Sequence, residues 1–129
     1  MNQTAGAEVL TVDDESRWRE LLPAAASVFG SVEFARIRRD HAGVEPRLFA
    51  FPAGDGHVVH PLLLSSTASL ALGEEADRRL FDAATPEYSG PFASTAPSPA
   101  DRDAFSEALG GWCAGAGVVT EFDHLHPWK

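Results

Sequence analysis

The hydrophobic residues fall into short runs, some continuous and some at helical spacing. Two runs, residues 47–51 and 57–64, are apolar at successive positions, which is typical of strands covered on both faces. The segment 53–56 joins them and contains two glycines, which can take the positive φ values of a tight turn. We therefore predict a β-hairpin inside a layered fold, with the leucines at 62–64 in the core.

Two helices are predicted in the first third of the chain, after a short first strand at 8–12. Asp13 is a plausible N-cap for the first helix, and Pro23 should end or kink it because proline has no backbone N–H to donate. Ser31 is a plausible N-cap for the second helix, and Gly43 should end it. The expected faces are Trp18, Leu21, Leu22 and Ala25 on the first helix, and Phe34, Ile37 and His41 on the second.

The last third of the chain predicts a helix followed by a strand. Ser98 precedes a proline at the first helical position and Asp101 at the third, which is the pattern of a capped helix start. Apolar residues then recur at helical spacing to about Cys113, and glycines at 115 and 117 should end the helix. Residues 118–122 read as a strand, so the chain is predicted to be one α/β domain over residues 1–129.

Composition narrows the functional classes. The net charge of −9 disfavours nucleic acid as a partner of this chain alone. Cys113 is the single cysteine, so no intramolecular disulfide can form, and the first ten residues lack the features of a signal peptide. No apolar run approaches the roughly 20 residues of a membrane helix. We therefore expect a cytoplasmic protein with no membrane contact.

Two polar segments are candidates for chemistry. In residues 85–91, turn-forming residues enclose Glu87 and Tyr88. The carboxylate could act as a general base or an amine anchor and the phenol as a donor, or the tyrosine could simply pack over a sharp corner at Gly90. Glu121, in an apolar strand, is the second carboxylate whose pKa burial could raise.

The second polar segment lies at the C-terminus. His124 and His126 are two positions apart, so both would project to one side of an extended segment, as metal ligands can. Two ligands do not make a metal site, and structural hydrogen bonding is the alternative. We assign no metal, and we assign no role to His57 and His60, since a histidine among valines and leucines is usually a satisfied core or edge residue.

These two segments carry a family resemblance. Residues 85–91 (Thr-Pro-Glu-Tyr-Ser-Gly-Pro) and 118–128, which include the run Phe-Asp-His-Leu-His-Pro-Trp, resemble Fem-like transferases of the GNAT superfamily, including the BioF2-like acetyltransferases. The preceding segments 28–34 and 60–62 fall in the order that this family shows. The resemblance covers most of the chain and corresponds to the first of two GNAT-like halves.

The resemblance implies a fold and a reaction. It implies a single GNAT-like half-domain with a mixed sheet, a hairpin and three to four flanking helices. From the residues themselves, the candidate catalytic residues are Glu121 and Glu87, and the candidate substrate-binding residues are Tyr88, Ser89, His124 and His126. The reaction would move an acyl or aminoacyl group to a small-molecule amine, with acyl-CoA or aminoacyl-tRNA as the donor of the complete enzyme.

The chain by itself is not expected to bind a cofactor. The glycines at 115 and 117 have the spacing of a CoA loop but lack its leading residue, and they end a helix rather than open one. A second half, as a homodimer or as another polypeptide, would have to complete the enzyme. The alternatives are a non-catalytic half-domain that binds a small ligand or a protein, and a truncated remnant that aggregates.

Overall fold

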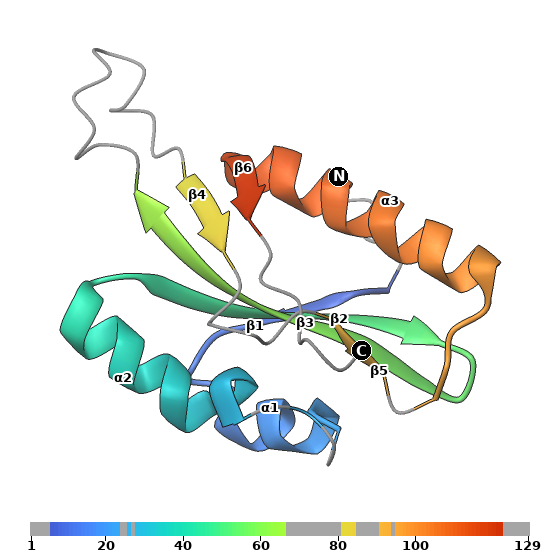
Figure 1. Cartoon of the computed structure of the whole chain (residues 1–129), viewed down its shortest axis with the longest axis horizontal. Coiled ribbons are helices and arrows are strands. Elements are labelled where there is room, and N and C mark those ends of the chain that lie inside the picture. The colour runs from blue at the N-terminus through green and yellow to red at the C-terminus, as the bar shows by residue number, and fades with distance from the viewer. Residues whose placement is uncertain are drawn as a thin grey trace.

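The computed structural model describes residues 6–23, 26, 28–66, 81–84, 91–93 and 95–122. In this part of the chain, a mixed β-sheet lies between helix α3 on one face and helices α1 and α2 on the other (Figure 1). The elements are β1 (Glu8–Leu10), α1 (Glu15–Leu21), the 3₁₀ helix η1 (Val28–Gly30), α2 (Val32–Ala42), β2 (Glu45–Ala53), β3 (Gly56–Ser66), β4 (Phe81–Ala84), β5 (Phe92–Ala93), α3 (Pro99–Ala116) and β6 (Val118–Phe122). The predicted α/β class is confirmed.

The sheet has the order β1-β2-β3-β4-β6, and β5 pairs with β3 beyond the end of β4. Its pairs are antiparallel except for β4 and β6, which run parallel because α3 connects β5 to β6 across one face. The carboxyl ends of β4 and β6 therefore lie at the same end of the sheet, where Ala84 pairs with Phe122. In open α/β sheets, such ends are common places for ligands.

The predicted hairpin forms and is longer than its apolar runs, since β2 and β3 pair from Glu45 with Leu64 to Ala53 with Gly56. Gly54 occupies the turn with a φ of +59°. Side chains alternate between two cores: Phe49 and Leu62 pack under α3, whereas Leu48 lies under α1 and α2. Both faces are covered, and the leucines at 62–64 are buried as predicted.

The core under α1 and α2 is centred on Trp18. This side chain is buried, and its indole Nε1 donates a hydrogen bond to the carbonyl of Gly30 at 3.0 Å. Helix α1 ends at Leu21, before Pro23, as predicted. Its N-cap is Asp14 rather than the predicted Asp13, and the Asp14 carboxylate accepts a hydrogen bond from the Thr11 amide in the preceding turn.

Helix α2 has the predicted ends but a different buried face. The Ser31 hydroxyl accepts a hydrogen bond from the Phe34 amide, and Gly43 ends the helix in the left-handed region. The buried residues are Val32 and Ala35, however, and Ile37 is 52% exposed. The face that carries Phe34, Ile37 and His41 is therefore not the one that packs on the sheet. The smaller side chains face the sheet, and the half-buried Phe34 packs edge-on against Phe29 instead.

Helix α3 begins as predicted, with the Ser98 hydroxyl accepting from the Asp101 amide. It continues three residues beyond Cys113 and ends at the left-handed Gly117, so Gly115 lies inside the helix rather than beyond it. Its buried side chains pack on the sheet and are Phe105, Ala108, Leu109 and Trp112. Across the described residues, none of the helices combines the length and apolar character needed to cross a bilayer.

Candidate functional site

The most unusual polar contact in the described residues joins His60 of β3 to Glu121 of β6. The His60 side chain is fully buried, and its Nε2 lies 2.7 Å from Oε2 of Glu121. About a quarter of the Glu121 side chain remains exposed to solvent. Within this pair the imidazole is closed off from solvent and the carboxylate is accessible, so only the carboxylate can contact a substrate directly.

A β-bulge puts Glu121 on the face that carries His60. Val118 pairs with Phe81, but the next pair is Thr120 with Asp82, so Val119 is an additional residue in β6. Without this residue the strand alternation would place Thr120 opposite Ala83. With it, Glu121 lies opposite Ala83, whose side chain belongs to the core under α3. Bulges commonly redirect a side chain in this way next to active sites.

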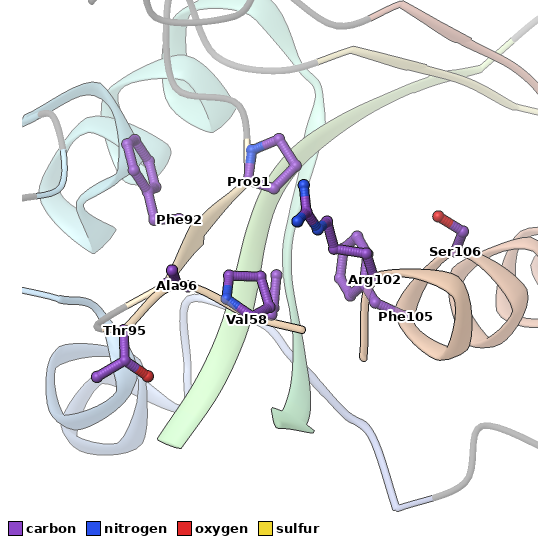
Figure 2. Close-up of a pocket in the computed structure, with 10 residues that line it drawn as sticks. Val58, Pro91, Phe92, Thr95, Ala96, Arg102, Phe105 and Ser106 are labelled. Carbon is purple, nitrogen blue, oxygen red and sulfur yellow. The ribbon is translucent and has the colours of Figure 1, made fainter. Parts of the chain in front are cut away.

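A pocket of about 700 Å³ opens on the same side of the sheet, between β5, the following loop and the first turns of α3, and neither His60 nor Glu121 is among its described lining residues. Its described walls are mainly apolar, and the polar side chains among them are those of Arg102, Thr95 and Ser106. Figure 2 shows Arg102, Phe105 and Ser106 projecting from α3, and Pro91 and Thr95 on the side of β5 and its loop. Its size is within the usual range for small-molecule sites.

The pair and the pocket share Phe105. This ring lines the pocket and also contacts the His60 imidazole edge-on, with 6.1 Å between ring centroids. Val58, two residues before His60 on the same face of β3, lines the pocket as well. The pocket and the acid–base pair are therefore parts of one region on the α3 side of the sheet.

Of the predicted site residues, the structure describes Glu121 alone. Glu87, Tyr88, Ser89, His124 and His126 lie outside the described residues. Ala84, which precedes the first motif, and Phe122, which lies within the second, are register partners at the carboxyl ends of β4 and β6. Pro91, the last residue of the first motif, lines the pocket.

Sequence reasoning missed His60, to which we assigned no role. It is the buried ionisable residue on this face, and it contacts a predicted catalytic carboxylate. A signal was present, because an ionisable residue inside an otherwise apolar strand needs a polar partner when it is buried. Arg102 was also missed, since nothing in the sequence around an exposed helix position indicates a pocket.

The described residues contain no group of three His, Cys, Asp or Glu side chains that could hold a metal ion. The glycine pair at 115 and 117 lies at the C-terminal end of α3, as expected, where the helix dipole repels phosphate. The opposite end of α3 is also poorly suited to phosphate, because Pro99 has no amide hydrogen and Asp101 is negative. No family model, curated protein or solved structure matches this chain.

Proposed function

We propose that this domain is one half of a transferase that moves an acyl or aminoacyl group to an amine, in the manner of Fem-like GNAT enzymes. The observation that carries the proposal is the contact between the buried His60 and the partly exposed Glu121, on the side of the sheet that also has a pocket large enough for a substrate. The mixed sheet with its hairpin and flanking helices is also the architecture that the sequence resemblance implies.

Glu121 is the proposed general base. An amine that attacks an acyl carbon must lose a proton as its nitrogen forms the new bond and the ester or thioester bond of the donor breaks. The exposed part of the Glu121 carboxylate can accept that proton. His60 does not reach solvent, so its proposed part is to orient the carboxylate through the 2.7 Å contact. It is a positioning residue rather than a catalytic one.

The donor would be held by a second half. Neither end of α3 offers a phosphate site, and the net charge of −9 opposes binding of tRNA by this chain alone. Strand β6 is the last strand on the described path of the sheet, and Val119 on it is 55% exposed. An edge strand of this kind can pair with another chain, which supports a homodimer or a complex with a separate transferase half.

Acyl transfer by the purified chain, alone and with proteins encoded beside it, tests the proposal. Release of CoA from acetyl-CoA should be measured over a panel of primary amines, together with aminoacyl transfer from charged tRNA. Glu121→Gln should reduce the rate by on the order of 100-fold or more, as expected for loss of a general base. Glu107→Gln, on the exposed side of α3, is the matched control and should leave the rate unchanged. Equal rates for Glu121→Gln and the unmodified chain would exclude this mechanism.

A second candidate function is non-catalytic binding of a small ligand. The observation in its favour is the pocket itself, whose described lining is mainly apolar and includes the guanidinium of Arg102. This combination can hold a ligand without any reaction. Under this function the chain would bind a small molecule and show no turnover with any donor.

A further inference from the structure

The pocket between β5 and α3 has a positively charged residue, Arg102, in its lining. Among the lining residues that the structure describes, Arg102 is the only ionisable side chain. This is unusual in a chain with 19 acidic residues and a net charge of −9. The local charge of the pocket is therefore opposite to that of the protein as a whole, which favours an anionic ligand at this place.

Arg102 also differs from most other arginines of the structure. Five described arginines contact a carboxylate, and they are Arg17, Arg19, Arg36, Arg39 and Arg47. In the described part of the chain, Arg102 has no such ion pair, although Asp101 and Asp103 flank it in sequence. Adjacent helix positions do not face each other, and neither aspartate lines the pocket. The guanidinium is thus available to a ligand.

The other residues that line the pocket indicate what the uncharged part of the ligand should be. Val58, Pro91, Ala96 and Phe105 present apolar surface, and the hydroxyls of Thr95 and Ser106 add two neutral polar groups. An apolar body would bury surface against these walls, at a gain of roughly 25 cal/mol for each Å² removed from water. One guanidinium matches the two oxygens of one carboxylate in a paired, bidentate contact.

A phosphate ligand fits less well. Phosphate sites usually recruit backbone amides at a helix N-terminus, but the first turn of α3 has Pro99, which has no amide hydrogen, and Asp101, which repels anions. The Asp101 amide already donates to the Ser98 hydroxyl. A single negative charge on a carboxylate needs only the one arginine that the pocket supplies.

We propose that this pocket binds a small monocarboxylate with an apolar body, and that Arg102 holds the carboxylate. This inference rests on the second proposed function, ligand binding, and gives it a ligand class. It is independent of proton transfer at Glu121, which does not line the pocket.

The test uses three probes with the same body, 4-phenylbutyrate, 4-phenylbutanamide and 4-phenylbutylamine, titrated into the ¹⁵N-labelled full chain and followed by NMR. The carboxylate should bind most tightly and shift the amide signals of Thr95, Ala96 and Ser106. Arg102→Gln should raise the dissociation constant of the carboxylate on the order of tenfold and leave that of the amide unchanged. Arg102 is exposed to solvent, so the Arg102→Gln variant should remain folded.

Arg38→Gln is the control for net charge. Arg38 lies on α2, across the sheet from the pocket, and it too lacks an ion pair among the described residues. It should leave all three dissociation constants unchanged. Equal binding of the three probes, or equal effects of Arg102→Gln and Arg38→Gln, would overturn the carboxylate assignment while leaving a ligand pocket in place. No binding of any probe would overturn the pocket function as well.

Discussion

The imidazole of His60 contacts the carboxylate of Glu121 at 2.7 Å, although 61 positions separate the two residues in the chain. The contact joins a central strand to the last strand on the described path of the sheet, across the face that α3 covers. A fully buried imidazole beside a partly exposed carboxylate is costly to form, because both groups lose contacts with water. Their mutual hydrogen bond offsets this cost, and its removal should be measurable.

Removal of the carboxylate should destabilise the fold. Glu121→Ala takes a hydrogen-bond partner from the buried His60, and we expect the free energy of unfolding to fall by about 1–3 kcal/mol. Glu107→Ala removes an exposed carboxylate from α3 and should change the free energy of unfolding by less than about 0.5 kcal/mol. Urea unfolding followed by tryptophan fluorescence measures both.

A double-mutant cycle with His60→Leu measures the interaction free energy between His60 and Glu121, separately from the destabilisation that each single substitution causes. Coupling between Glu121→Ala and His60→Leu should lie in the range of about 0.5–3 kcal/mol, as for residues in direct contact. Additive effects would show that the two side chains do not stabilise each other.

Acid should weaken the layer formed by β1, α1 and α2. The hydrogen bond from Arg17 lowers the pKa of Glu8, and hydrogen bonds from Arg36 and Arg19 lower the pKa of Glu15, in each case below the ordinary value of 4.5. The unfolded chain therefore binds these protons at a higher pH than the folded chain does. This contribution to stability is complete above about pH 4.5 and is lost as the pH falls through the lowered values.

The urea midpoint, measured from neutral pH to about pH 3, checks this expectation. Glu8→Gln should lower the midpoint at neutral pH and reduce its dependence on pH below 4.5, since one of the two carboxylate partners of Arg17 no longer titrates. Glu107→Gln, which lies on α3 and has no ion pair among the described residues, should keep the pH dependence of the unmodified chain. Parallel curves for all three proteins would contradict the prediction.

Replacing either of two glycines inside α3 by alanine should stabilise the fold. Nothing lies within 4 Å of a Cβ built at Gly110 or Gly111, and both are interior positions of the helix. Alanine at either position should raise the free energy of unfolding by about 0.5–1 kcal/mol. Gly117→Ala is the contrasting variant, because its φ of +80° ends the helix in the left-handed region. Gly117→Ala should lower the free energy of unfolding by about 1–2 kcal/mol. A stabilising effect of this substitution would show that the helix ends elsewhere.

The proposed second half predicts self-association or a partner. Light scattering on the chain alone should give about twice the 13.8 kDa mass if two copies pair through β6. Val119→Lys should then favour the monomer, since lysine on an edge strand opposes pairing. Val28→Lys changes a still more exposed valine on η1, 70% against 55% for Val119, and should leave the mass unchanged. A monomer that also binds no neighbouring protein would contradict the proposed transferase half.

The parts of the fold that could be predicted from the sequence are those with strong local signals. Ser98, followed by proline and Asp101, starts α3 where expected, and the hairpin turns within the predicted segment, at Gly54 and Asp55. The buried face of α2 could not be predicted in this way. Both the Val32 and Phe34 sides carry apolar residues, and the choice between them depends on how closely the helix approaches the sheet.

The site was harder to predict than the fold. Glu121 was recognised as a carboxylate in an apolar strand, but strand alternation alone gives no indication of the additional residue at Val119 that directs it toward the α3 side. The contact with His60 depends on the order of three strands, which only the tertiary structure supplies. The pocket at Arg102 likewise arises where a loop meets a helix, and no local motif marks it.

The β2–β3 hairpin has a consequence for how the protein unfolds. Its side chains alternate between two cores, with Leu48 and Val59 under α1 and α2 and Phe49 and Leu62 under α3. Both cores contain side chains of this hairpin. If one core opens, it therefore exposes apolar surface on the same two strands that form part of the other core. The two layers are therefore one cooperative unit, and the amides of β2 and β3 should exchange with solvent only when the whole domain opens.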